Sequence, residues 1–374
     1  MKIEVDSAAF SDAVAWATRI LPSRPATPIL AGIKLEAADG ILSLSTFDYE
    51  KSARHHIEAG VDEPGTVVVL GRLLADIAKA LPQGKISLQT NNSRISISGG
   101  KSNFSLQLMP EGDYPQLPEI PADLGQVDAD TFSRAIAKTA VAVAREENRV
   151  VLKGIRISID NDKVVMTSTD RFRLARTSFS WTPSHPDFSG TLLIDGGVLR
   201  DISRSIDTTS NVVLGYDSEK PTLLSFSNAG RQSTAQLIDG EFPAVDRLFV
   251  DEYPIHALIN RNELISAITR VALVAEKNAP IRMVFSENEV QLSAGNADES
   301  QAKETIEAQL DGEPITVAFN PSYLKEGLSA IDEPYVRMKM VNAARAVEFN
   351  GQQELDGDES LDYRYLLVPM RFID

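Results

Sequence analysis

The feature that most constrains the fold of this chain is a sequence pattern that occurs three times. A segment with helical spacing of apolar residues recurs at 9–20, 131–143 and 263–275. A second helix-like segment recurs with its leucines spaced by 125 residues: Leu74, Leu199 and Leu324. Repeats this long indicate a few similar domains in series and not a solenoid of short units.

The segments between these helices read as strands. Apolar and polar residues alternate in ILSLS (41–45) and RISIS (94–98), as they do in half-buried strands. Residues 30–54 align with 152–176 at a constant offset of 122, and proline and acidic residues mark linkers at 117–126 and 249–258. We therefore predict an α+β fold of three repeated domains, 1–120, 121–250 and 251–374, each with two helices packed on antiparallel sheets.

Composition narrows the class of protein. The chain has no cysteine, which excludes disulfides and thiolate metal sites, and its formal charge is −16. The N-terminus lacks an apolar signal segment, and no apolar run reaches the ~18 residues of a membrane span. These features predict a cytoplasmic protein with no membrane partner. A net negative charge repels nucleic acid as a whole, so DNA binding would need a local basic surface.

The sequence contains no catalytic motif. Phosphate-loop, dinucleotide, HExxH and GxSxG patterns are all absent. His55 and His56 are adjacent in an expected strand, where they face opposite sides and cannot share a metal. The acidic run 354–360 lacks calcium-loop spacing and reads as a hairpin tip, and 160–163 reads as a turn. We therefore expect a protein that is not an enzyme and has no metal or cofactor.

The patterned positive charge lies on the expected helices, while carboxylates crowd the strands and loops. Lysine and arginine are good helix formers, so solubility alone could explain any one of them. Taken over the repeat, the pattern predicts that the helices share one basic face that could meet a phosphate backbone.

Four separated motifs then resemble the bacterial sliding clamp family, the β subunit of the replicative DNA polymerase. They are SRPATPILAGIKLEA (23–37), STDRFRLART (168–177), FNPSYLKEGL (319–328) and YLLVPMRF (365–372). The resemblance runs over the whole chain, and the threefold repeat is the architecture of that family. It implies a head-to-tail homodimer that closes into a ring around duplex DNA, with the sheets outside and the helices lining the hole.

The resemblance also implies roles for named residues. The predicted DNA contacts, from the family and from the basic helices, are Arg24, Lys79, Arg134, Lys138, Arg145, Arg149, Arg200 and Arg204. Glu146 and Glu147 make the loop at 145–151 less basic than the family pattern. The predicted dimer contacts are Phe104 and Leu106 on one side and Leu273 on the other, and core packing is the alternative for Phe104.

A peptide-binding pocket between the central and C-terminal domains is the second implied feature. It would capture short linear motifs from the replicative polymerase, the clamp loader and repair proteins. The matching residues are Leu152, Thr169, Arg171, Phe172, Arg173, Leu174, Pro243, Arg247, Leu248, Asn320, Tyr323, Ala344, Ala346, Leu366, Leu367, Val368, Pro369, Met370 and Arg371. Arg171, Phe172 and Phe372 depart from the common family residues, which predicts a changed pocket shape and partner preference.

The leading interpretation is thus a processivity clamp. The alternative is a repeat-built scaffold that binds proteins but no DNA, for which the charge of −16 argues. A hydrolase with carboxylates that the sequence does not pair is remote.

Overall fold

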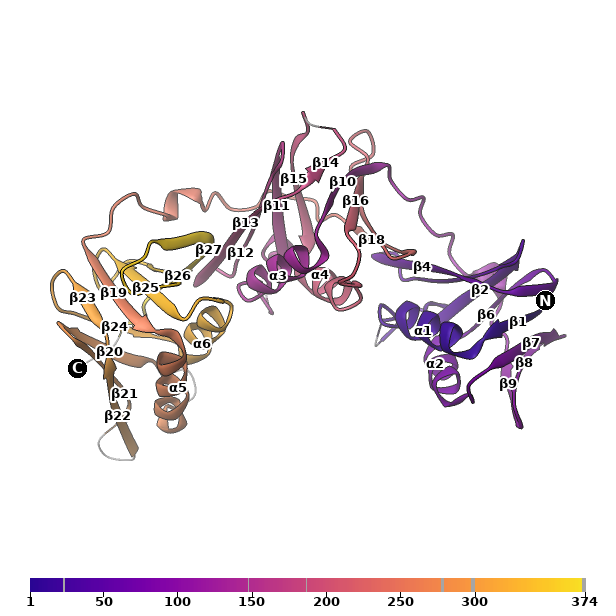
Figure 1. The fold of residues 1–374 in the computed structure, drawn as a ribbon, viewed down its shortest axis with the longest axis horizontal. Coiled ribbons are helices and arrows are strands. Elements are labelled where there is room, and N and C mark those ends of the chain that lie inside the picture. The colour runs from indigo at the N-terminus through magenta and orange to yellow at the C-terminus, as the bar shows by residue number, and fades with distance from the viewer. Residues whose placement is uncertain (23, 147, 186, 277–278, 297–299, 372–374) are drawn as a thin grey trace. The chain divides into compact units, whose positions relative to one another are not determined.

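The computed structural model describes residues 1–22, 24–146, 148–185, 187–276, 279–296 and 300–371, so Glu147 and Phe372 lie outside the described residues. The chain forms two compact units, whose elements are labelled in Figure 1. The first unit comprises Met1–Ser133, Trp181–Pro186 and Val198–Leu237, and the second comprises Arg134–Ser180, Asp187–Gly197 and Ile238–Asp374.

The first unit contains a nine-stranded antiparallel sheet. In spatial order its strands are β14 (Thr182–Pro183), β10 (Asp123–Val127), β16 (Val212–Tyr216), β17 (Leu223–Asn228), β18 (Arg231–Gln236), β4 (Lys51–Glu58), β3 (Ile41–Phe47), β2 (Gly32–Ala38) and β6 (Gly65–Leu70). A second sheet has the order β5 (Gly60–Glu63), β1 (Lys2–Asp6), β7 (Lys85–Asn91), β8 (Arg94–Gly99) and β9 (Ser102–Gln107).

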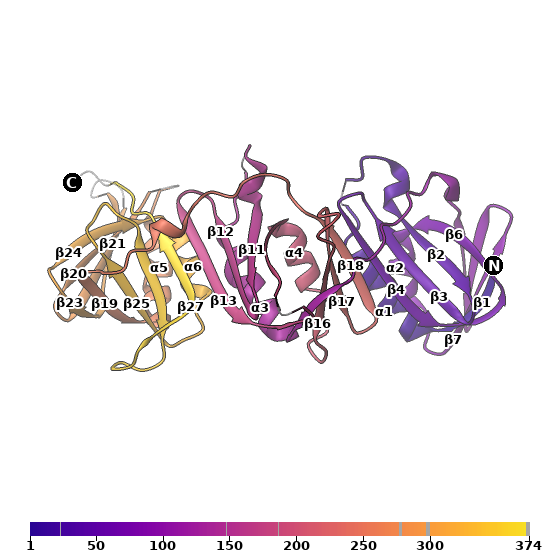
Figure 2. The same cartoon turned by 90° about the horizontal axis from the view of Figure 1, so that it is seen from above.

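The second unit repeats this plan. Its nine-stranded sheet has the order β15 (Ser189–Asp195), β11 (Gly154–Asp160), β12 (Lys163–Thr169), β13 (Arg173–Ser180), β27 (Glu359–Leu367), β26 (Val347–Gln352), β25 (Tyr335–Met340), β19 (Ile255–Asn260) and β23 (Gln309–Asp311). Figure 2 shows β11, β12, β13 and β27 side by side. The remaining sheet has the order β22 (Ser300–Glu307), β21 (Glu289–Asn296), β20 (Ile281–Ser286) and β24 (Ile315–Phe319).

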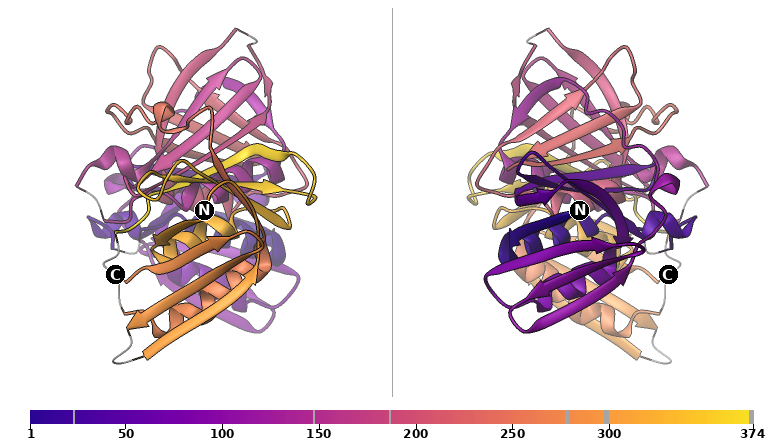
Figure 3. Two further views of the ribbon diagram at one scale, coloured as in Figure 1. Left: turned by 90° about the vertical axis from the view of Figure 1, so that its left-hand side faces the viewer. Right: turned by 90° about the vertical axis from the view of Figure 1, so that its right-hand side faces the viewer.

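The α-helices of the described residues are α1 (Ser7–Thr18), α2 (Gly71–Ala80), α3 (Ala129–Ala140), α4 (Gly196–Ser203), α5 (Arg261–Val271) and α6 (Pro321–Ser329). In the first unit α1 packs on α2 and touches β3 and β4 of one sheet and β1 of the other. In the second unit α5 packs on α6 and touches β19 and β25 as well as β21 and β22, as the left view of Figure 3 shows in orange and gold. Helices packed on antiparallel sheets confirm the predicted fold class.

The aligned heads of the repeated helices are core residues. Phe10, Phe132 and Leu264 are each at most 1% exposed. Their helices begin where a side chain accepts the first backbone N–H groups: Asp6 caps α1, and Asn260 caps α5. The repeat that the sequence shows is therefore a repeat of buried contacts.

The two nine-stranded sheets also agree in register. Lys34, Ser45 and Arg54 lie in one row across β2, β3 and β4. Their partners at the offset of 122 form the same row across β11, β12 and β13: Arg156, Thr167 and Arg176.

The histidine pair and the two acidic turns lie as predicted. His55 contacts the ring of Trp16 and the carbonyl of Gly230, whereas His56 Nδ1 lies 2.8 Å from Ser43 Oγ on the other face of β4. Residues 160–163 turn between β11 and β12, and 353–358 join β26 to β27. Among the described residues there is no group of three His, Cys, Asp or Glu side chains arranged to hold a metal, and no helix is long and apolar enough to span a membrane.

One glycine fixes how closely α6 packs on the sheet. A Cβ added at Gly327 would overlap the ring of Tyr365, which is fully buried. We predict that Gly327→Ala destabilises the protein by about 1–3 kcal/mol through overpacking. Chemical denaturation followed by circular dichroism measures this. Ser329→Ala, on the exposed face of the same helix, is the control, and an equal effect of the two changes would contradict the packing argument.

Candidate functional site

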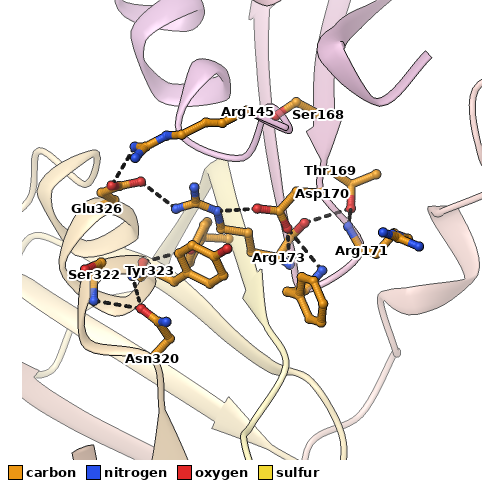
Figure 4. A network of polar contacts seen from close by, with 12 residues as sticks. Arg145, Ser168, Thr169, Asp170, Arg171, Arg173, Asn320, Ser322, Tyr323 and Glu326 are labelled. Carbon is orange, nitrogen blue, oxygen red and sulfur yellow. Dashed lines mark hydrogen bonds and ion pairs between the residues drawn. The ribbon is translucent and has the colours of Figure 1, made fainter. Parts of the chain in front are cut away.

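The turn between β12 and β13 is held by its own side chains (Figure 4). Asp170 Oδ1 accepts the backbone N–H groups of Phe172 and Arg173, each at 3.0 Å. Thr169 Oγ1 accepts the N–H of Arg171 at 3.2 Å and donates to the Arg173 carbonyl at 2.7 Å. Arg171 has a φ of 80°, which the surrounding hydrogen bonds hold in the left-handed region. This fixed turn leaves Phe172 55% exposed.

Arg173 ties this turn to α6 (Figure 4). Its side chain is buried, with Nε donating to Asp170 at 2.9 Å and Nη1 donating to Glu326 at 2.7 Å. Its guanidinium lies 4.0 Å from the ring centroid of Tyr323, and Arg145 donates to the same Glu326 at 2.8 Å. Burial acts to lower the pKa of Arg173, but Tyr365 and the two carboxylates outweigh it and raise the pKa. The guanidinium therefore stays charged and is paired with two carboxylates.

The N-terminus of α6 is fixed in a similar way. Asn320 is its N-cap, accepting the N–H groups of Ser322 at 2.9 Å and Tyr323 at 3.1 Å, and Pro321 begins the helix. The hydroxyl of Tyr365 donates to the carbonyl of Tyr323 at 2.9 Å. The cap and this bond place the Tyr323 ring against Arg173.

The end of the chain is bound to two strands. Regular pairing of β27 with β13 stops at Leu367, two residues before Pro369, which has no backbone N–H to donate to a sheet. Val368 N–H then donates to the Phe172 carbonyl at 2.9 Å, and Met370 N–H donates to the Ala318 carbonyl at 2.7 Å. Leu366 and Leu367 are buried, whereas Val368 is 42% exposed. The tail is thus core where it begins and surface where it ends.

An apolar cluster lies beside this tail. Its buried members are Leu174, Leu193, Phe242, Val245 and Leu366, bordered by Val151, Ile238, Phe249 and Ala346. Sequence reasoning found Leu174, Leu366 and Ala346. It missed Phe242, although the alignment of EGDYPQLP (111–118) with DGEFPAVD (239–246) places this residue opposite Tyr114.

The remaining residues of the predicted peptide pocket are divided between core and surface. Leu152 and Thr169 are buried, and Pro243, Pro369 and Met370 are partly buried. Those on the surface are Arg171, Arg247, Leu248, Ala344 and Arg371. Their assignment to a pocket stays a prediction.

The equivalent place in the first unit differs in polarity. The repeat positions of Leu174 and Leu366 are Ser52 and Thr234, whose hydroxyls form a buried hydrogen bond of 2.6 Å. The ion pair next to them is kept, because Lys51 pairs with Asp201 at 3.1 Å as Arg173 pairs with Glu326. We call the pairing of β4 with β18 the first junction and the pairing of β13 with β27 the second junction. The side chains at the first junction are polar, whereas those at the second junction are apolar.

The predicted DNA contacts are mostly on the surface. Arg24, Lys79, Arg200 and Arg204 are exposed in the first unit, and Arg134, Arg145 and Arg149 are exposed in the second. Lys138 is half-buried because it pairs with Asp332 at 2.7 Å and lies 5.6 Å from the ring centroid of Tyr363. Lys138, Arg145 and Arg204, which pairs with Asp201 at 3.8 Å, are therefore among the predicted contacts that already have a carboxylate partner within the chain.

The predicted dimer contacts lie near sheet edges. Leu106 belongs to the core of the first unit, and Phe104 packs against that core from β9, an outer strand of its sheet. Leu273 is 82% exposed in the 3-10 turn Ala272–Val274 that follows α5.

Comparison with known proteins places this fold in one class. The crystal structure of a DNA polymerase sliding clamp from Bacillus subtilis matches the whole of both chains with a TM-score of 0.92 at 24% identity. The fold is that of a DNA polymerase sliding clamp.

Sequence relatives define the family. Family models of the DNA polymerase III beta subunit match residues 1–118 (N-terminal domain), 126–244 (central domain) and 246–371 (C-terminal domain). The beta sliding clamp of Streptomyces coelicolor is 40% identical over 373 residues, 99% of each chain. That of Micrococcus luteus is 39% identical over 313 residues, 83% of this chain and 100% of the relative. The chain belongs to the DNA polymerase III beta subunit family, the sliding clamps that serve as processivity factors in DNA replication.

The buried charge network generates a prediction. Arg173→Met removes the cation shared by Asp170 and Glu326 and leaves two carboxylates without it, so we expect a loss of about 3 kcal/mol in unfolding free energy. Urea denaturation at neutral pH measures this. The control is Arg345→Met, because Arg345 is exposed. A loss no larger than that of the control would show that the network does not hold α6 to the turn.

Proposed function

We propose that two copies of this chain close head to tail into a ring around duplex DNA. In this proposal each chain contributes three modules, 1–120, 121–250 and 251–374. The ring slides without reading sequence and tethers the replicative polymerase, the clamp loader and repair proteins in the cytoplasm. Its role is mechanical and not catalytic.

The observation that best supports a closed ring is the exposed Leu273, which lies beside an unpaired sheet edge. β9 in the first unit and β22 in the second are terminal strands of their sheets, with no further strand paired outside them among the described residues. Such edges present unpaired backbone groups to another chain. The turn that carries Leu273 touches β22, so an exposed apolar side chain lies next to one of these edges. Pairing β9 of one copy with β22 of the next would cover both edges and Leu273.

DNA binding in this proposal depends on local charge. A net charge of −16 opposes DNA contact at large, while exposed arginines and lysines on or near the helices offer local contacts to phosphates. Phosphate contacts carry no sequence information, so a ring held by its closed shape can move along any duplex.

The apolar cluster supports partner binding at the second junction. Leucine, valine and phenylalanine side chains gather there beside a half-exposed tail, whereas the repeat positions of the first junction hold two hydroxyls. Met370 adds an adaptable side chain of the kind that accommodates several partners. We propose that a short apolar motif docks on this cluster, with Leu248, Val368 and Phe172 as its exposed contacts.

The ring is tested by topology. After loading by a cognate clamp loader onto nicked circular DNA, the protein is expected to dissociate once the DNA is cut to a linear form, because a ring slides off an open end. Gel filtration of the DNA before and after cutting measures the bound protein. Retention on the linear DNA, or no loading at all, would favour the scaffold that binds proteins alone.

A variant in the same assay tests the interface. Leu273→Ala removes exposed apolar area, so we expect the dimer dissociation constant to rise about tenfold and loading to fall. Leu361→Ala, at a leucine that is 59% exposed elsewhere, is the control. An unchanged monomer–dimer equilibrium in Leu273→Ala would count against this edge as the interface.

Partner binding has its own test. The double variant Leu248→Ser/Val368→Ser removes two exposed apolar side chains at the cluster, so a labelled peptide with a polymerase clamp-binding motif should bind about tenfold or more weakly. Leu355→Ser/Leu361→Ser changes two leucines of similar exposure away from the cluster and should leave the affinity unchanged. Fluorescence anisotropy gives both affinities. Equal binding by the two variants would remove the cluster from the docking site.

A further inference from the structure

Each nine-stranded sheet has two basic residues in one row across three strands: Lys34 and Arg54 in the first unit, and Arg156 and Arg176 in the second. The two rows have different partners. In the second unit Asp246 accepts a hydrogen bond from Arg176 and another, of 3.4 Å, from Arg156. Burial acts to raise the pKa of Asp246, but the hydrogen bond and charge of Arg176, with help from Arg156, lower it. Asp246 lies in the linker from β18 to β19 (residues 237–254), so this row binds a carboxylate supplied by the chain itself.

Aromatic rings complete this arrangement in the second unit. The guanidinium of Arg156 lies 5.3 Å from the ring centroid of Phe242, and that of Arg176 lies 4.4 Å from that of Phe249. Carboxylate and rings all come from residues 242–249 of one linker. In the second unit this row is therefore occupied by a peptide segment of the same chain, in which Asp246–Leu248 form a short 3-10 helix.

The first unit has the same row without its carboxylate. In the alignment that pairs Pro115 with Pro243, Asp246 is replaced by Pro118. Lys34 pairs with Glu36 at 3.3 Å, and the half-buried guanidinium of Arg54 makes no hydrogen bond or ion pair with any residue that the structure describes. Tyr114, the counterpart of Phe242, lies in the linker from β9 to β10, and its hydroxyl donates to backbone carbonyls of β2 and β3 at 3.4 and 3.5 Å.

A cavity of about 900 Å³ lies between this row and the linker. We call it the linker groove; its basic wall is Lys34, Arg54 and His56, and its linker wall is Tyr114, Pro115 and Leu117. Glu36, Glu111 and Glu119 also border it. Three carboxylates at the rim oppose a densely charged polyanion such as nucleic acid, while a single carboxylate can reach the unpaired Arg54.

We propose that the linker groove binds a peptide segment supplied in trans, with an Asp or Glu carboxylate on Arg54 and Lys34. In this proposal the carboxylate of the bound segment contacts Arg54 and Lys34 in the way that Asp246 contacts Arg176 and Arg156. A guanidinium offers a carboxylate two parallel donors, and here these donors have no partner to give up. The segment's apolar residues then pack beside Tyr114 and Leu117, as Phe242 and Phe249 pack in the second unit. This inference does not depend on ring closure or on the proposed motif pocket.

A peptide copied from the linker between β18 and β19 of this chain tests binding to the linker groove. A capped, fluorescein-labelled peptide of residues 239–250, DGEFPAVDRLFV, is titrated into the full-length protein and followed by anisotropy. We expect saturable binding that weakens about tenfold or more when the aspartate matching Asp246 is replaced by asparagine. Arg54→Gln should cause the same loss, while Arg94→Gln, an exposed arginine on β8, should cause none.

A second variant fills the groove from within. Pro118→Asp places a carboxylate at the linker position equivalent to Asp246, so it should compete with the peptide and weaken its binding about tenfold at unchanged thermal stability or better. Absence of saturable binding to the unmodified protein, or equal affinity for the unmodified protein and Arg54→Gln, would overturn the proposal. Equal competition by a DNA oligonucleotide at matched phosphate concentration would also overturn it, because the groove would then select charge and not a carboxylate peptide.

Discussion

Antiparallel pairing between distant strands is the interaction on which the rest of the structure depends. β4 pairs with β18 in the first unit, and β13 pairs with β27 in the second. Each pairing joins two short sheets into one of nine strands and brings together residues that are far apart in the sequence. The turn at Asp170, the tail after Leu367 and the helix α6 are neighbours only because of the second pairing.

The two units have the same arrangement of strands but different side chains at the pairings of β4 with β18 and of β13 with β27. Both junctions keep a cation on the inner strand and a carboxylate on the facing helix, Lys51 with Asp201 and Arg173 with Glu326. Each ion pair links a strand of the sheet to the helix that faces it. The residues around them can then vary in polarity, so one junction is hydroxyl-lined and the other apolar, without a change in strand order or register.

Much of this was predictable because it follows from local pattern. Helical periodicity, alternation in strands and the turn at 160–163 each depend on residues near one another in sequence. Because the pattern occurs three times, two helices in each repeat could be predicted from the sequence. The sharing of strands between modules could not be read, because alternation does not say which edge a strand will meet.

The missed details depend on where linkers run. Arg156 and Arg176 look like ordinary surface charges in sequence, and only the path of residues 242–249 brings Asp246 and two phenylalanines onto them. Lys138 and Arg145 likewise looked like members of a uniform basic face until Asp332 and Glu326 were seen beside them. Side-chain partners set by long loops carry no periodic signal.

The continuous sheets have a mechanical consequence. Strands within one sheet separate only when a whole row of backbone hydrogen bonds breaks together, so β4–β18 and β13–β27 resist being pulled apart far more than a surface contact does. Each unit is therefore braced from within by its own nine-stranded sheet, and a force on that unit is resisted first by this row of hydrogen bonds.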